Sequence, residues 1–355
     1  MPDCRAHHAH STHGRQLQHL KGLGDYIDSD TISHLAQLTA LQTLDLTTER
    51  YALPVRLQRL QLLQSLSSLR SLRLGNHLAG HELCELAGTL PALQQLELSY
   101  VSEMDCSVQE LLPLQRSRTL QRLALAGINA TDQLLQVLAG TQVTDLSLFG
   151  GSFCVSPAGA ALMVGRLQRL QLSVNDASSA ALAAVLPVLG SGLTCLSLSI
   201  HKAVADCRGL LQAVFQLPVL QQLSLQSHYN ALTEAELQCL PVASHLVQLS
   251  LGNHFSDATL RLVLCSTPGL RHLSLSSCGG VGSQGLGCVP GHCRGVRSVK
   301  LELMRGATAA GVAALASGQG LSRVVLEGCR NVSAEECRQL MRLLKRPHLD
   351  IIKLR

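Results

Sequence analysis

Residues 270–275 read Leu270-Arg271-His272-Leu273-Ser274-Leu275, and this alternation of leucine with polar residues recurs along the whole chain. The same pattern, with Val or Ile at some leucine positions, begins at Leu41, Leu69, Leu93, Leu120, Val143, Leu167, Leu193, Leu220, Leu246, Leu270, Val296, Leu321 and Leu349. Consecutive copies lie 23 to 28 residues apart, and a degenerate copy begins at Leu17. Such a repeat length predicts a solenoid of stacked units.

Each copy predicts one short strand. Because strand side chains alternate between two faces, Leu96 and Leu98 face one side and Glu97 the other. We expect the leucines to pack between neighbouring repeats, and the third and fifth positions of each copy to line an exposed concave face. Leu57–Leu62 also fits the pattern but lies too close to its neighbours for a full repeat. We interpret it as the return helix of the repeat that begins at Leu41.

Helix signals follow the strands. Thr233–Glu236 and Ser333–Glu336 match the capping box, in which a hydroxyl and a carboxylate three residues later satisfy each other's backbone N–H groups. Ser156 followed by Pro157 predicts a helix start with proline at the first helical position. These signals predict helices that return along the convex side.

The array resembles the leucine-rich-repeat superfamily over residues 17–355, as about thirteen repeats after the degenerate first copy. Leu275-Ser-Ser-Cys278-Gly-Gly-Val281 and Leu326-Glu-Gly-Cys329-Arg-Asn-Val332 resemble its cysteine-containing subclass, which occurs in the repeat domain of F-box substrate receptors. The resemblance implies an α/β leucine-rich-repeat solenoid, a curved horseshoe with parallel strands on the concave face and helices on the convex face. Residues 1–16, rich in histidine, are expected to be a disordered tail.

The sequence favours a location in a reducing compartment of the cell. Residues 1–8 lack the apolar core of a signal peptide, and no run approaches the roughly 18 apolar residues of a membrane span. The 13 cysteines are an odd number without an export signal, which predicts free thiols in a cytoplasmic or nuclear protein. Association with the cytoskeleton stays open.

Positive charge gathers at the carboxyl-terminal end, where residues 291–355 contain 12 Lys and Arg against 5 Asp and Glu. The third and fifth positions of each copy hold uncharged or weakly charged side chains in the middle repeats, for example Gln222 and Ser224, and basic ones in the last repeats. We predict that a protein partner, acidic or phosphorylated, binds there. Nucleic acid is disfavoured because no aromatic residues offer a platform for stacked bases. The predicted partner-binding residues are Arg271, His272, Arg297, Lys300, Arg323 and Lys353.

The ninth repeat position holds Asn, Cys or Thr in the superfamily, and histidine replaces them at His77, His201, His228 and His254. We expect these imidazoles to bond the backbone of a turn, as asparagine does, with those of the consecutive repeats stacked on one another. The alternatives are a metal-binding array and a pH sensor.

Two further motifs have ordinary explanations. Gly280-Val-Gly282-Ser-Gln-Gly285 copies a dinucleotide-binding fingerprint, but the repeat pattern already accounts for its strands. Cys4 and the histidines near it could bind a metal, but no second group of ligands has the spacing of a zinc site. We therefore predict neither a cofactor nor a metal ion.

The function expected is a non-enzymatic scaffold that binds a protein on its concave face, since no catalytic motif is present. The resemblance implies an alternative, the substrate-recognition subunit of an F-box ubiquitin ligase with a Skp1-type adaptor as a further partner. Residues 1–40 leave little room for an F-box. A regulator of a small GTPase is a third possibility within the superfamily.

Overall fold

The structure is a computed structural model that describes residues 17–21, 29–47, 60–75, 80–98, 108–174, 176–201, 207–228, 232–344 and 348–354. The predicted tail, residues 1–16, and His77 lie outside the described residues, as does Leu57. The chain divides into two compact units, Met1–Gly151 and Ser152–Arg355.

The first unit contains six parallel strands that neighbour one another in chain order. They are β1 (His19–Lys21), β2 (Thr43–Leu46), β3 (Ser71–Leu74), β4 (Gln95–Leu98), β5 (Arg122–Ala126) and β7 (Asp145–Phe149). The helical segments between them are α1 (Ser29–Leu35), η3 (Leu60–Ser65), α2 (Gly80–Thr89), η4 (Val108–Arg116) and, after the short strand β6 (Ala130–Thr131), α3 (Asp132–Ala139). Since η3 includes residues 60–62, that part of the ambiguous copy is helical, as predicted.

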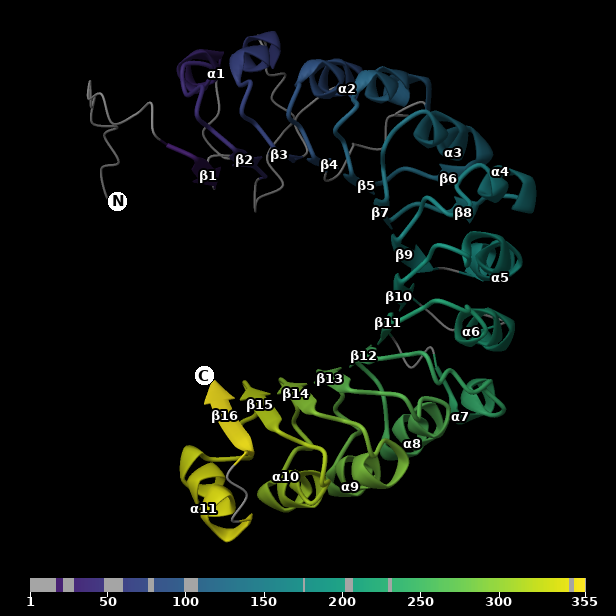
Figure 1. Cartoon of the computed structure of the whole chain (residues 1–355), viewed down its shortest axis with the longest axis vertical. Coiled ribbons are helices and arrows are strands. Elements are labelled where there is room, and N and C mark those ends of the chain that lie inside the picture. Colours follow the sequence, from purple (N-terminus) through teal and green to yellow (C-terminus); the bar gives the residue numbers. More distant parts are fainter. Residues whose placement is uncertain are drawn as a thin grey trace. The chain divides into compact units, whose positions relative to one another are not determined.

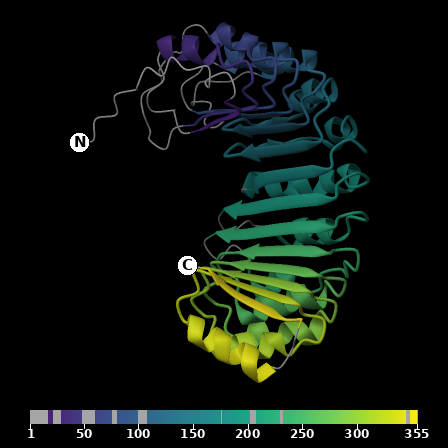
Figure 2. The ribbon, with the colours of Figure 1, turned by 60° about the vertical axis from the view of Figure 1, so that its left-hand side comes forward.

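The second unit contains eight parallel strands in chain order. They are β9 (Arg169–Val174), β10 (Cys195–His201), β11 (Gln222–His228), β12 (Gln248–Gly252), β13 (His272–Ser276), β14 (Ser298–Glu302), β15 (Arg323–Glu327) and β16 (Asp350–Leu354). The other elements are β8 (Phe153–Cys154), α4 (Pro157–Ala161), α5 (Asp176–Leu189), α6 (Cys207–Phe215), α7 (Glu234–Leu237), α8 (Asp257–Cys265), α9 (Ser283–His292), α10 (Ala309–Ala316) and α11 (Ala334–Leu344). Within this unit the strands line the inner side of a bend and the helices its outer side (Figure 1), and the strands form one ladder (Figure 2).

The register confirms the repeat pattern. Leu196 and Leu198 of β10 pair with Leu223 and Leu225 of β11, and all four are at most 2% exposed. Complete burial of one such leucine stabilises a fold by about 1.5–3 kcal/mol. The chain is thus an α/β leucine-rich-repeat solenoid in which stacked leucines form the core of each unit.

The predicted capping boxes are present. The Ser333 backbone N–H donates to Glu336 Oε2 at 2.7 Å, and the Glu336 N–H donates to Ser333 Oγ at 3.1 Å. The bond from the Ser333 backbone, followed by one from the Ser333 side chain, lowers the pKa of the Glu336 carboxyl group. Thr233 and Glu236 form the second box, and Ser156 caps α4 with Pro157 in its first turn. Within the residues that the structure describes, no helix is long and apolar enough to cross a membrane.

The last strand departs from the prediction by one residue. The sequence pattern placed Ile352 and Leu354 inward, but Ile351 pairs with the buried Val324, and Leu354 is 46% exposed. A shift of one residue exchanges the two faces of a strand. Lys353 therefore takes the inward register position, and its Nζ donates to the backbone carbonyls of Cys329 and Val332.

The turn cysteines lie where the consensus places them. Cys278 Sγ donates to the carbonyl of Leu251 in the preceding repeat at 3.4 Å, and Cys329 Sγ contacts the Leu301 carbonyl at the same distance. Burial raises the pKa of Cys278 to about 11. Each thiol thus links two consecutive repeats as an uncharged donor.

We expect the buried thiols to resist alkylation in the folded protein. Only the thiolate reacts, and with a pKa of about 11 roughly one Cys278 or Cys293 side chain in a thousand is ionised at pH 8. Iodoacetamide at pH 8 followed by peptide mass spectrometry should modify the exposed Cys154 and Cys239 first. Equal labelling of all four in the native protein would contradict this packing.

Candidate protein-interaction surface

The strand starts of β13 to β15 carry a row of exposed arginines, here called the arginine row: Arg271, Arg297 and Arg323. Their backbones are neighbours in the ladder, because the Arg297 N–H donates to the Arg271 carbonyl at 2.8 Å and the Arg323 N–H donates to the Arg297 carbonyl at 3.0 Å. Arg271 and Arg297 come directly before β13 and β14, whereas Arg323 is the first residue of β15 and pairs with Ser298. None of the three has an ion-pair partner among the described residues. The row therefore presents three guanidinium groups, each with five N–H donors.

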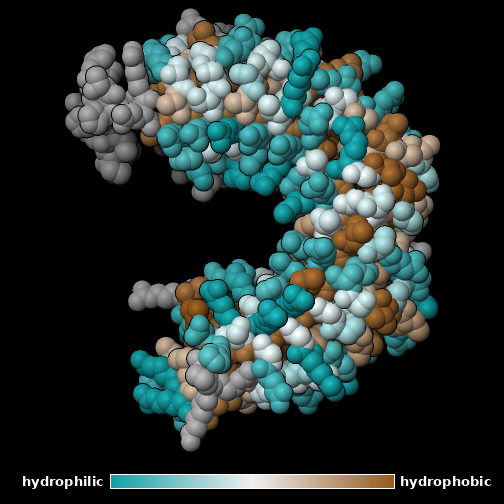
Figure 3. Space-filling view, viewed as in Figure 1, coloured by the Kyte–Doolittle hydropathy of each residue, from teal (hydrophilic) through white to brown (hydrophobic). Residues whose placement is uncertain are grey.

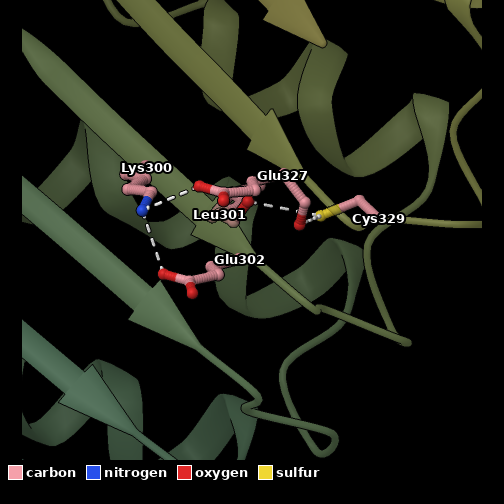
Figure 4. A network of polar contacts seen from close by, with 5 residues as sticks. All are labelled: Lys300, Leu301, Glu302, Glu327 and Cys329. Carbon is pink, nitrogen blue, oxygen red and sulfur yellow. Dashed lines mark hydrogen bonds and ion pairs between the residues drawn. The ribbon is translucent and has the colours of Figure 1, made fainter. Parts of the chain in front are cut away.

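Two of the other predicted residues lie next to this row. His272 is exposed at the first position of β13. Lys300 lies two residues into β14, but it is not available as a lone cation. Its Nζ contacts Glu327 Oε2 at 2.9 Å and Glu302 Oε2 at 3.0 Å (Figure 4). The hydrogen bonds that Lys300 donates to these carboxylates, that to Glu327 first, raise the pKa of Lys300.

Glu302 and Glu327 were missed in the sequence analysis, because the second, third and fifth positions of each repeat were considered for this surface and not the seventh. They occupy the seventh position, and paired strands align them with each other. The inner face of these repeats is thus basic where the strands begin and acidic where they end. Including the seventh position of each repeat in the sequence analysis would have predicted this separation of basic and acidic side chains.

The predicted Lys353 does not belong to this surface. Its amino group is bonded to two carbonyls of the turn that follows β15. The sequence pattern grouped it with the exposed residues because it assumed the other register of β16. Of the predicted residues, the structure brings together the arginine row, His272 and Lys300.

The middle of the same face is neutral. Ser197, Ser224, Ser250 and Ser274 follow one another across β10 to β13 in register. Their side chains are partly exposed and none is part of the buried core. This strip offers a partner short hydroxyl side chains and no net charge.

His201 and His228 depart in part from their predicted role. The predicted stacking of these two rings is confirmed, with centroids 4.4 Å apart and an interplanar angle of 5°. The two residues end the strands β10 and β11, where a turn residue was expected, and the segments that follow them lie outside the described residues. His254 is exposed, while the adjacent Phe255 is buried. Among the described residues, no group of three His, Cys, Asp or Glu side chains could hold a metal ion.

The glycine motif has a structural role. Gly282 caps α9, and its N–H donates to Asp257 Oδ1 at 2.7 Å. A Cβ at Gly285 would lie 2.2 Å from the same oxygen. A carboxylate from the previous repeat therefore occupies the position that a dinucleotide phosphate would take at this helix start.

The first unit carries a separate set of charges on its strand face. Arg73 of β3 contacts Glu97 Oε2 of β4 at 2.8 Å and Asp45 Oδ2 of β2 at 3.7 Å. Arg122 and Asp145 form a similar pair on β5 and β7 at 3.5 Å. Exposed pairs of this kind contribute about 0–1 kcal/mol to stability, so they define the pattern of the surface more than they stabilise the fold.

Comparisons with known proteins support the fold. No family model matches the chain, and no curated protein matches it in sequence. Among solved structures, 170 chains match. One of them is the crystal structure of a yeast Rad7 and Elc1 complex, which matches with a TM-score of 0.51 and 18% identity over 95% of this chain and 81% of that one. At this identity the similarity concerns the fold alone.

We expect His201 to titrate below the ordinary histidine pKa of 6.5. Burial lowers its pKa most, and the charge on His228 lowers it further. Stability should therefore be retained above pH 6.5 and decrease as the pH falls through the lowered pKa of His201. NMR titration of the ring protons measures this, and His228→Gln should move the midpoint part of the way back. A His201 midpoint unchanged by that substitution would show that the stacked rings are not coupled.

Proposed function

We propose that the chain is a protein-binding scaffold that captures its partner on the inner face of the strands. The observation that carries this is the arginine row: three exposed cations at the starts of three consecutive strands, with no ion-pair partner among the described residues. Such residues contribute nothing to the leucine core. Repeat proteins use the strand face for binding because it is long, rigid and free of core residues.

The proposed partner is acidic where it meets the arginine row. Guanidinium groups bind carboxylates and phosphates through two parallel hydrogen bonds, which gives orientation as well as attraction. Beyond the row, the partner meets Lys300 held between Glu302 and Glu327, and a basic group there would pair with either carboxylate. A segment that is acidic at one end and basic at the other fits this surface.

Charge reversal of the arginine row tests the proposal. Arg271→Glu, Arg297→Glu and Arg323→Glu together should abolish capture of the partner, because three attractive contacts become repulsive. The readout is affinity purification from the native cell with quantitative mass spectrometry against the unchanged chain. Lys300 is left intact, since a glutamate there would place three carboxylates together.

The matched control reverses two exposed arginines of the helical side, Arg338→Glu and Arg342→Glu. Arg338 contacts Glu335 at 2.6 Å, an exposed pair within one helix, so little stability depends on it. The proposal requires the same proteins to be lost from the first variant and retained by the control. Retention of every partner by the first variant would refute binding at the arginine row.

A second candidate function is recognition of substrates for a ubiquitin ligase. Two observations favour it: the buried turn cysteines match the subclass found in F-box substrate receptors, and one structure of similar fold is that of Rad7 in complex with Elc1. On this proposal the strand face would bind the substrate, and another part of the chain would bind a Skp1-type adaptor.

Co-expression with a Skp1-type adaptor distinguishes the two functions. A substrate receptor should form a stable complex with the adaptor on size-exclusion chromatography, and the triple charge reversal of the arginine row should leave that complex intact. If no complex forms with the adaptor while the arginine row still captures a partner, the chain is a scaffold without this role.

A further inference from the structure

A second site lies on the strand face of the first unit, where a hollow of about 340 Å³ extends over β1 to β4. Four of the residues that line it are charged: Lys21, Asp45, Arg70 and Arg73. The others are three glutamines and two hydroxyl residues, so the whole lining is polar. Figure 3 shows hydrophilic residues along the inner side of this unit. The volume falls at the lower end of the range of ligand pockets, about 300–1,000 Å³.

The hollow has a surplus of positive charge. Among the residues that line it, three cations face one carboxylate, that of Asp45, which is already engaged; Glu97, which contacts Arg73, lies outside the lining. Asp45 is 8% exposed, its Oδ1 accepts from the N–H and the hydroxyl of Thr47 at 3.1 and 2.7 Å, and its Oδ2 faces Arg73 at 3.7 Å. Asp45 therefore repels an incoming anion less than an exposed carboxylate would.

The cations differ in how firmly they are held. Arg73 is fixed between two strands by Glu97 and Asp45, which leaves most of its five N–H donors unused. Lys21 and Arg70 are exposed and have no ion-pair partner among the described residues. One cation is thus positioned in advance, and two can close on a ligand.

We propose that this hollow binds the phosphoryl group of a phosphorylated serine or threonine in the partner. A phosphoryl group carries nearly two negative charges at pH 7 and three strong acceptor oxygens, which match the charge surplus and the arginine, lysine and amide donors. A carboxylate carries one negative charge and two acceptor oxygens, and so satisfies fewer of these donors than a phosphoryl group does. A nucleic acid would find no aromatic side chain in the lining on which to stack a base.

This inference rests on the proposed function in one respect, namely that the partner is a protein lying on the strand face. It concerns different residues in a different unit from the arginine row. The two proposals can therefore fail separately.

The test uses the full chain and a peptide of defined sequence, acetyl-Gly-Gly-phosphoserine-Gly-Gly-amide. The arginine Nε–Hε resonances of Arg70 and Arg73 should shift and saturate as the peptide is added. Arg70→Gln should weaken binding about tenfold, because a charge-assisted hydrogen bond is lost. Lys21→Gln should weaken it several-fold.

Arg122→Gln is the matched control, since Arg122 is an exposed arginine of the same strand face but lies outside the hollow. It should leave the affinity unchanged, as should the triple charge reversal of the arginine row. The same peptide with glutamate in place of phosphoserine should bind at least tenfold more weakly.

Four results would overturn the proposal. Equal affinity for the glutamate peptide would make the hollow a general carboxylate site. Saturable shifts with inorganic phosphate but none with the peptide would make it a site for a free ion. Equal losses in the Arg122 and Arg70 variants, or no saturable shift with any probe, would remove the site altogether.

Discussion

The paired strands of each unit bury their leucines because neighbouring repeats stack on one another. A single repeat in isolation would leave the leucines of its strand exposed to water, at a cost of about 1.5–3 kcal/mol for each leucine. Parallel pairing in register is therefore obligatory, as Leu196 with Leu223 and Leu198 with Leu225 illustrate. The remaining features follow from this constraint. The turns that follow the strands must also stack on one another. The thiol of Cys278 contributes to this by donating a hydrogen bond to the Leu251 carbonyl of the preceding repeat. The alternate side chains must face outward, and they are free to bind.

The alternation of leucine predicts the strands and their buried faces. A period of two residues is enough to tell which side chains of a strand face the core, whatever strand lies next to it. It fails where two registers satisfy it equally. The last strand has adjacent Ile351 and Ile352, either of which can face inward. The choice depends on contacts distant in sequence, among them the bonds of Lys353 to the Cys329 and Val332 carbonyls. At the ninth position the predicted stacking of His201 on His228 is confirmed, but the two residues belong to the strands β10 and β11, whose length the leucine pattern does not set.

The sequence predicts which charged side chains the candidate surfaces expose, but not which of these side chains contact one another. Exposure of Arg271, Arg297 and Arg323 follows from their positions in the repeat. That Lys300 is held by Glu327 does not, because these residues are 27 positions apart and meet only through the register of β14 and β15. The hollow of the first unit was missed because the second repeat position, which Arg70 occupies, was considered only in the last repeats, and because Lys21 belongs to the degenerate first copy.

The inner face of the last repeats is basic where the strands begin and acidic where they end, and this distribution of charge restricts which partners can bind there. Arg323 begins β15 and Glu327 ends it. Four residues of a strand separate them, about 13 Å at 3.3 Å per residue. A partner that spans this distance must present an acidic group at one end and a basic group at the other. The reverse orientation would place like charges together at both edges. A uniformly acidic partner would be attracted to the strand starts and repelled at the strand ends. The carboxylates therefore contribute to specificity by excluding partners that the arginines alone would accept.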